Sequence, residues 1–219
     1  MIDDDKRAAA LAAVAEVRPG MLLGLGTGST AAFAIERIGV LVREGLDIRA
    51  VATSRRSEAA ALAAGIPVVD FAGIAAVDLT IDGADEIDPG LVAIKGAGGA
   101  MLREKIVAAA SRRMIVIADA SKRVERIGRA RLPVEILPFA RAFVATRLAA
   151  LGAAAAIRGD FRTDQGNLIF DCKFSEMPDP VRLAAAISAI PGVLGHGLFL
   201  DEVDCAYIGD GGRVIRLDR

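Results

Sequence analysis

The sequence predicts an α/β protein: an open, mostly parallel sheet with helices on both faces (Rossmann-like), plus a smaller ferredoxin-like α+β domain. Two observations lead to this prediction. Up to about residue 130, β-branched runs alternate with Ala-rich helical stretches, the order found in parallel sheets covered by helices. From residue 131 the order changes to β-α-β-β-α-β, the split βαβ arrangement. We therefore expect a larger α/β domain over 1–130 and 202–219 and an inserted domain over 131–201.

Local signals place the elements of the larger domain. Pro19-Gly20 stops the first helix, Gly45 caps the second, and the third begins at Ser54 and ends at Gly65. The helices are expected at residues 4–17, 30–44, 54–65 and 100–110. The strands are expected at residues 21–25, 48–52, 66–69, 77–82, 91–95 and 114–118, and a closing hairpin in 202–219 returns to the first sheet.

The inserted domain should contain four strands and two helices. Its strands are expected at 132–137, 153–158, 168–174 and 194–200, and its helices at 139–151 and 179–190. The turn DQGN at 164–167 fits a hairpin between the middle strands because Gly tolerates positive φ. The motifs place this domain away from the chemistry, and its apolar strands suggest contacts between subunits.

Composition excludes several classes of function. The 219 residues include 27 basic and 28 acidic side chains, so the net charge of −1 favours no nucleic-acid partner. No apolar run reaches the roughly 18 residues of a membrane span, and the start MIDDDKR is acidic where a signal peptide is basic. Two isolated cysteines fit a reduced, cytoplasmic location, and a single His disfavours an imidazole-based metal site. We expect no metal, no nucleic acid and no membrane partner.

The first candidate site is the turn GLGTGST, which leads from a strand into a helix. Backbone N–H groups and hydroxyls converge there, and the helix dipole attracts an anion. The phosphate-binding residues would be Thr27, Gly28, Ser29 and Thr30. A dinucleotide site and a purely structural tight turn are the alternatives, although neither G-x-G-x-x-G nor a P-loop lysine is present. The segment TSRRSE at 53–58 could help to close this site, or it could be a helix cap followed by solvated Arg.

Acidic residues dominate the second candidate site, IDGADEID. Asp82 and Asp85 flank Gly83-Ala84, so a tight turn could direct both carboxylates into one cavity. Two neighbouring carboxylates raise one pKa, which lets one hold a proton while the other stays ionised. The alternatives are a calcium loop, which the position of the Gly disfavours, and an exposed acidic loop.

A lysine and a glutamate frame the third candidate site, KGAGGAMLREK. Lys95 ends a strand, the loop from Gly96 through Ala97 to Gly98 allows close approach of a ligand to the backbone, and Glu104 lies in the next helix. A carboxylate beside an amine and backbone donors suits a general base next to an oxyanion site. The alternative is a surface pair between Glu104 and a neighbouring basic residue.

Three further residues are considered as site candidates because of their positions in the predicted fold. Lys122 follows a strand at the sheet edge where ligands of open α/β proteins collect, although it could equally be a solvated side chain. Lys6 is a weaker candidate, and His196 is interpreted as structural.

Together these segments resemble the type A family of ribose-5-phosphate isomerases over nearly the whole chain. The matching segments, in the family's order, are GLGTGST, TSRRSE, TIDGADEID, KGAGGAMLREK, IADASK, LPVEILPFAR, TDQGN and PGVLGHGLF. The resemblance implies interconversion of D-ribose 5-phosphate and D-ribulose 5-phosphate in the pentose phosphate pathway. It also implies no metal or organic cofactor, a homodimer or homotetramer, and a catalytic role for the larger domain.

The resemblance also assigns roles to the candidate residues. Glu104 would be the proton acceptor, and Lys95 with the backbone from Gly96 to Gly98 would steady the oxyanion. Asp82 and Asp85 would handle hydroxyl protons and ring opening, while Thr27 to Thr30 and Lys122 would contact the substrate. Ala97 departs from the family, where Gly is frequent, and Ala disfavours positive φ.

Two other functions are alternatives to this one. A sugar-phosphate sensor would keep the fold and phosphate site without catalysis, but the candidate catalytic residues Glu104, Lys95, Asp82 and Asp85 are all present. A coenzyme A transferase would share the fold and a catalytic Glu, but the short chain and compact sugar-phosphate motifs disfavour it.

Overall fold

The largest sheet organises the molecule. The computed structural model describes residues 2–219 and places six strands in the order β13-β12-β6-β3-β1-β2. Neighbours from β12 to β2 are parallel, and β13 is antiparallel at the edge. The strands are β1 (Leu22–Leu25), β2 (Arg49–Ala52), β3 (Leu79–Gly83), β6 (Met114–Asp119), β12 (Cys205–Asp210) and β13 (Arg213–Asp218). The predicted fold class is confirmed, and the final hairpin returns to the first sheet as expected.

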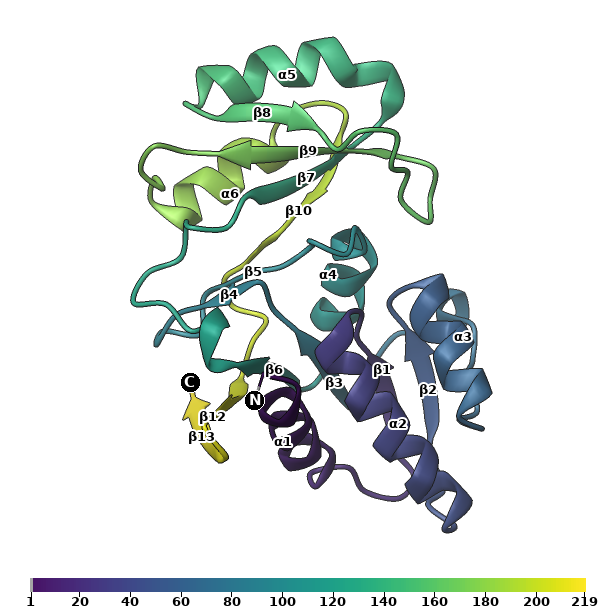
Figure 1. Cartoon of the computed structure of the whole chain (residues 1–219). Helices are drawn as coiled ribbons and strands as arrows, with labels where there is room; N and C mark the ends of the chain where they lie inside the picture. Colours follow the sequence, from purple (N-terminus) through teal and green to yellow (C-terminus); the bar gives the residue numbers. More distant parts are fainter. Residues whose placement is uncertain (1) are drawn as a thin grey trace.

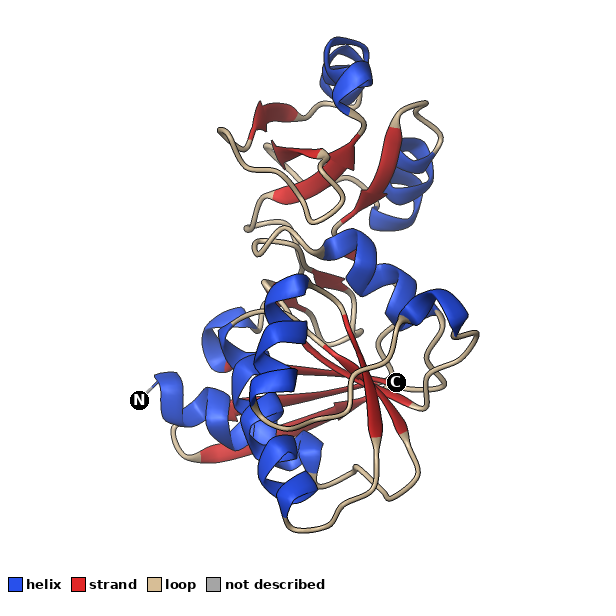
Figure 2. Cartoon of the chain, turned by 90° about the vertical axis from the view of Figure 1, so that its right-hand side faces the viewer, coloured by secondary structure: helices blue, strands red, loops and turns tan. Residues whose placement is uncertain are grey.

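Helices cover both faces of this sheet (Figures 1 and 2). On one face α1 (Ile2–Val14), α2 (Ser29–Arg43) and α3 (Arg55–Ala63) share a core with inward residues of the strands. On the other face α4 (Met101–Ala109) packs through Val107 and Ala108. The small side chains of α1, with Ala9, Ala10 and Ala13 fully buried, let the helix lie close to the sheet.

A second, antiparallel sheet forms the upper part of Figure 1. Its strands are β7 (Leu132–Ile136), β8 (Ala154–Ile157), β9 (Leu168–Lys173) and β10 (Val193–His196), in the order β10-β7-β9-β8. The helices α5 (Arg141–Ala150) and α6 (Pro180–Ser188) pack against it around a separate apolar core. The β-α-β-β-α-β order and the strand order 4-1-3-2 are those of a ferredoxin-like unit.

Two strand predictions were wrong in part. Residues 91–95 do not join the parallel sheet: β5 (Ala93–Ile94) pairs antiparallel with β4 (Glu86–Ile87) and β11 (Leu198–Phe199) in a third sheet. Residues 66–69 form only an isolated bridge between Ala50 and Val68. Apolar composition alone signals an extended buried segment and not its pairing partner, which lies far away in the sequence.

The remaining regular elements are three short 3₁₀ helices at Phe71–Gly73, Ala120–Lys122 and Pro138–Ala140. The strand expected at 194–200 divides at Gly197 into β10 and β11, so the chain passes from the second sheet to the third. Among residues 2–219 no helix is long and apolar enough to cross a membrane.

We expect Gly209→Ala to destabilise the fold, because α1 lies directly over Gly209 of β12. A Cβ at residue 209 would lie 2.0 Å from the carbonyl oxygen of Asp5, so helix and strand must separate. The expected loss is about 1–3 kcal/mol in the free energy of unfolding, measured by urea denaturation. Gly73→Ala is the matched control, because nothing lies within 4 Å of its added Cβ. Equal stability of the two variants would contradict the close packing of α1.

Candidate active site

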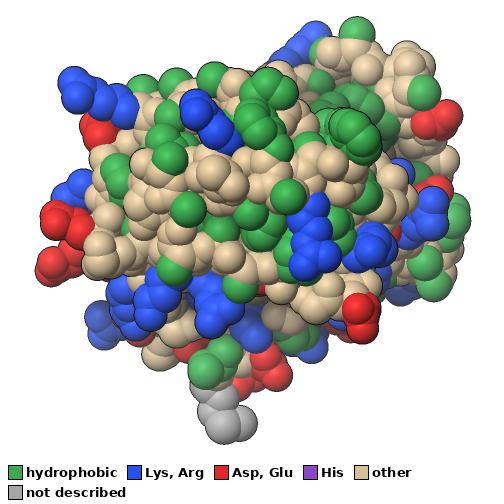
Figure 3. Space-filling model, turned by 90° about the horizontal axis from the view of Figure 1, so that it is seen from above, with side chains coloured by type: hydrophobic (Ala, Val, Ile, Leu, Met, Phe, Trp, Pro, Cys, Tyr) green, Lys and Arg blue, Asp and Glu red, His purple; other side chains and the backbone are tan. Residues whose placement is uncertain are grey.

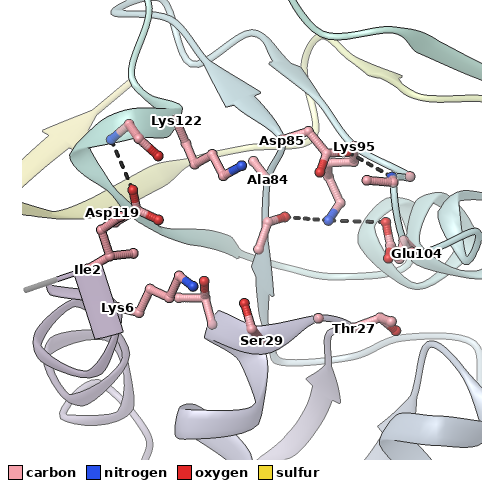
Figure 4. A pocket seen from close by; sticks show the side chains of 17 residues that line it. Ile2, Lys6, Thr27, Ser29, Ala84, Asp85, Lys95, Glu104, Asp119 and Lys122 are labelled. Atoms are coloured by element: carbon pink, nitrogen blue, oxygen red, sulfur yellow. Dashed lines mark hydrogen bonds and ion pairs between the residues drawn. The ribbon is translucent and has the colours of Figure 1, made fainter. Parts of the chain in front are cut away.

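A cavity of about 430 Å³ opens at the carboxyl ends of β1, β3 and β6. This is the edge where open parallel sheets bind ligands. Figure 4 shows it from close by, with side chains from several separate segments directed inward. The lining residues are Ile2, Lys6, Thr27, Gly28, Ser29, Thr30, Gly83, Ala84, Asp85, Lys95, Gly96, Ala97, Gly98, Glu104, Asp119, Ser121 and Lys122. Every residue predicted for the site except Asp82 is in this wall.

Lys95 is the central charge of the site. Its ammonium lies 2.9 Å from Asp82 Oδ2 and 3.1 Å from Glu104 Oε2, and it donates to the carbonyl of Gly83. All three charged side chains are almost completely buried. Burial of an unpaired charge is costly, so the cation and the two carboxylates depend on one another. Figure 4 shows Lys95 and Glu104 facing each other at one end of the cavity.

The surroundings shift the pKa of both Lys95 and Glu104 upward. Burial raises the pKa of Glu104 to about 8, and the charge of Asp82 adds to this effect against the opposing influence of Lys95. Burial alone would lower the pKa of Lys95, but the carboxylates of Asp82 and Glu104 outweigh it and hold the ammonium protonated. A carboxyl with a pKa near neutrality is suited to accept a proton and return it.

The two aspartates occupy different environments, contrary to the expectation that both point into one cavity. Asp82 is fully buried behind the wall, where its Oδ1 accepts hydrogen bonds from the N–H groups of Thr27 and Gly83. Asp85 lines the cavity, and its Oδ2 accepts from Ala97 N–H at 2.8 Å. The difference arises because position 82 still belongs to β3, where Gly26 and Thr27 of the turn after β1 lie against its carboxylate, whereas Asp85 follows the end of that strand.

The turn before α2 has the conformation of an anion cradle. Gly28 has φ of 112° and precedes the first residue of α2, so Ser29 and Thr30 present the helix N-terminus to the cavity. The hydroxyl of Thr27 is bonded to those of Thr53 and Ser54 at 2.9 and 2.8 Å.

The TSRRSE segment supports this turn from behind. Ser57 adds a hydroxyl to the network, at 3.1 Å from that of Thr27, and donates to the carbonyl of Gly26. Arg55 and Arg56 are exposed and neither lines the cavity. The hydroxyls of this segment therefore position the turn, and its arginines do not close the site in this structure.

Two amines face the cavity from opposite sides near Ser29. Figure 4 shows Lys6 of α1 and Lys122 of the 3₁₀ helix after β6 directed into the cavity from the side opposite Glu104. Asp119 stands between them and accepts a hydrogen bond from Ser121 N–H. Asp119 and Ser121 also line the cavity but were not among the predicted residues. Lys6 reaches the cavity because α1 packs across β6 and β12.

His196 makes contacts expected of a structural residue. His196 is buried, its Nε2 lies 3.2 Å from Ser188 Oγ, and its Nδ1 accepts from Leu198 N–H. Burial lowers its pKa to about 4, and Lys105 contributes to this shift.

Among residues 2–219 no group of three or more His, Cys, Asp or Glu side chains is arranged to hold a metal ion. Ala97 keeps a negative φ, so its methyl does not strain the loop.

These features define a class of protein: an α/β protein whose cavity has a buried cluster of charged side chains at one end and a helix N-terminus with two lysines at the other. The family model for ribose 5-phosphate isomerase A (phosphoriboisomerase A) matches residues 49–212. A Sphingopyxis alaskensis protein named ribose-5-phosphate isomerase A is 56% identical over 214 residues, covering 96% of this chain and 94% of that protein.

Solved structures give the same assignment. A D-ribose-5-phosphate isomerase in complex with phospho-erythronic acid superposes with a TM-score of 0.97 at 34% identity, covering 100% of both chains. Ribose 5-phosphate isomerase A from Methanocaldococcus jannaschii superposes with a TM-score of 0.94 at 38% identity, covering 99% of both. The chain belongs to the ribose 5-phosphate isomerase A family.

We expect Lys95→Met to destabilise the protein more at high pH than at low pH. Without the ammonium, the folded-state pKa of Glu104, already raised, rises further, and the stability linked to such a group is lost as pH increases. The expected loss at pH 9 is about 3–5 kcal/mol in the free energy of unfolding, and a smaller loss is expected at pH 6. Urea denaturation at both values measures it. The matched control is Lys173→Met, an exposed lysine, which should leave the free energy of unfolding unchanged at both pH values. A loss of stability in Lys95→Met that does not depend on pH would contradict the buried ion cluster.

Proposed function

We propose that this protein interconverts D-ribose 5-phosphate and D-ribulose 5-phosphate, as a step of the pentose phosphate pathway, and that Glu104 is the general base. The observation that carries the proposal is the buried carboxylate of Glu104, held by Lys95 at one end of a cavity whose other end is cationic. A single carboxylate beside an oxyanion-stabilising cation is what a 1,2-proton transfer requires. Family membership supports the same reaction.

The proposed reaction begins with removal of the C2 proton of the open-chain aldose by Glu104. The electrons shift to the C1 carbonyl, giving an enediolate whose negative charge lies near the Lys95 ammonium. Glu104 then returns the proton to C1 while the O2 proton passes to O1, which leaves a carbonyl at C2 and completes the ketose. Donors preorganised around the developing charge are worth a few kcal/mol each, on the order of 3 kcal/mol for one oxyanion donor.

Each aspartate has a separate proposed role. Asp85 lines the cavity and would exchange the hydroxyl protons during ring opening. Asp82 has no access to the cavity, so it would act through Lys95 by holding the ammonium and through Glu104 by raising its pKa. This role replaces the expectation that Asp82 handles substrate protons directly.

The opposite end of the cavity would bind the phosphate. The N-terminus of α2 supplies N–H and hydroxyl donors from Gly28, Ser29 and Thr30. Ammonium donors come from Lys6 and Lys122. A phosphate held there would direct the sugar toward Glu104 and contribute binding energy from a group that does not react. The complex of a related isomerase with phospho-erythronic acid, a phosphorylated acid, supports this assignment.

We also propose that two or four copies associate through the 131–201 segment, in the cytoplasm. Phe139, just before α5, is fully exposed, and Phe143 in α5 is half-exposed. Figure 3, which views this end of the molecule, shows hydrophobic side chains among Lys and Arg. The buried, unpaired Cys172 and Cys205 are compatible with a reducing compartment. Light scattering at micromolar concentration tests the association, and a monomer would exclude it.

We expect rapid conversion of ribose 5-phosphate in excess chelator and a loss of at least about 10²-fold in kcat for Glu104→Gln, because the amide cannot accept the C2 proton. A coupled ketose assay measures both. The matched control is Glu125→Gln, an exposed carboxyl that does not line the cavity. A near-normal rate for Glu104→Gln would remove Glu104 from the mechanism. Substrate binding without turnover by the wild type would favour a sensor.

We expect kcat/KM to fall on the acid side with a midpoint near pH 8, because protonated Glu104 cannot act as a base. The profile for the free enzyme should therefore rise with pH through this value and drop about tenfold per unit below it. Asp82→Asn should move the midpoint to lower pH, since the charge of Asp82 raises the pKa of Glu104. An acid limb in the ordinary carboxyl range for the wild type would contradict the raised pKa of the buried Glu104.

A further inference from the structure

The segment that joins β8 to β9, residues 158–167, reaches from the second sheet to the catalytic loop. Arg158 comes directly after β8, and its Nη1 donates to the carbonyl oxygens of both Gly96 and Ala97 at 3.0 Å. The motifs place the inserted domain away from the chemistry, yet this segment contacts the loop that lines the cavity beside Lys95.

The guanidinium of Arg158 is held in a fixed orientation. Asp171 of β9 accepts from Arg158 Nε at 2.9 Å and from Nη2 at 2.5 Å, so the fork is bidentate. Both side chains are largely shielded from solvent, with exposed fractions of 20% and 16%. A bidentate pair of this kind orients the planar guanidinium, which leaves Nη1 directed toward the loop.

The contact with Gly96 reaches Asp85 through a single peptide group. The carbonyl of Gly96 and the N–H of Ala97 belong to the same planar unit and point in opposite directions. Arg158 holds the carbonyl, while the N–H donates to Asp85 Oδ2 at 2.8 Å. A cation on the carbonyl also polarises the peptide and strengthens its N–H as a donor. Arg158 therefore orients a cavity carboxylate that it does not touch.

The contact with Ala97 acts on the next peptide in the same way. The carbonyl of Ala97 faces Arg158, so the N–H of Gly98 in the same peptide group points away from the guanidinium. Gly98 itself lines the cavity. Within residues 2–219 the Gly98 N–H has no hydrogen-bond partner in the protein. This donor is available to an oxygen of a bound molecule.

The rest of the segment is anchored on both sides. Phe161 packs so closely on Gly99 that an added Cβ there would lie 2.4 Å from its ring. Asp164 accepts from the N–H of Arg55 at the start of α3. Thr163 and Asn167 donate to the buried carboxylate of Glu135 in β7, which fixes the base of the segment.

We propose that Arg158 is a positioning residue for the isomerase reaction: fixed by Asp171, it sets the Gly96–Ala97 and Ala97–Gly98 peptides so that Asp85 and the Gly98 N–H face the substrate. This inference rests on the proposed function, because it assigns a role within that same site. It gives the second sheet a direct part in catalysis, through the backbone of the loop.

Kinetics with Arg158→Met and Arg158→Lys test the proposal, with Arg162→Met as the matched control. Arg162 belongs to the same segment but is exposed and donates only to the carbonyl of its neighbour Phe161. We expect kcat for Arg158→Met to fall about 10- to 100-fold with a change in KM below about threefold, since small misplacements of reacting groups cost this much. Millimolar guanidinium should restore part of kcat, and Arg158→Lys should be intermediate. Arg162→Met should match the wild type.

Hydrogen exchange of residues 96–99 gives a second readout that needs no turnover. The Ala97 amide should exchange faster in Arg158→Met than in Arg162→Met at the same global stability. Unchanged kcat together with unchanged amide exchange in Arg158→Met would overturn the proposal. A loss of kcat that is fully explained by the fraction of unfolded protein, and that guanidinium does not restore, would also overturn it. If Arg158→Met does not fold, Asp171→Asn, which frees the guanidinium, must lower kcat and speed the same exchange. A wild type without isomerase activity would overturn the proposed function and leave the exchange result to decide the loop contact.

Discussion

The buried group of one ammonium and two carboxylates is the interaction on which the site depends. Lys95 pairs with Asp82 behind the cavity and with Glu104 in its wall, and each ion has lost most of its contact with water. Such burial costs several kcal/mol per ion, of order 20 kcal/mol in the idealised limit, and close pairing must offset it. The cluster therefore serves two ends at once. It fixes β3, β5 and α4 relative to one another, and it leaves Glu104 with a pKa of about 8, suited to accept a proton.

Around this cluster, function depends on backbone as much as on side chains. The cavity combines the N-terminus of α2, the loop from Gly96 to Gly98 and the turn after β3, all at one edge of the large sheet. Gly197 passes so close to Lys95 that an added Cβ would lie 2.1 Å from its carbonyl oxygen, while Lys95 N–H donates to the carbonyl of Gly197. With Arg158 holding the same loop from the other side, the second sheet helps to support the loop that follows Lys95.

Local sequence signals predicted most elements and most of the cavity wall. The alternation of strands and helices gave the parallel sheet, and turn chemistry placed Thr27 to Thr30 and Gly96 to Gly98 at strand ends. The prediction failed where pairing is long-range. Residues 91–95 pair with 198–199, more than 100 positions away, and no local signal carries that information. Asp82 and Asp85 look equivalent in the sequence, yet the turn after β1 packs on Asp82 and buries it, while Asp85 lines the cavity.

The sequence by itself determined the fold class, the β-α-β-β-α-β order of the inserted segment and the placing of charged residues at strand ends, because periodicity and glycine placement are local properties. Only the tertiary structure decided which of these groups meet. Lys6 reaches the anion-binding end because α1 packs across β6 and β12, and Arg158 reaches Gly96 because the second sheet stands above the catalytic loop. Arg158 and Gly96 are 62 positions apart, and α1 and β6 lie at even more distant positions in the sequence. Their geometry follows from packing of whole elements, and local sequence constrains that packing only weakly.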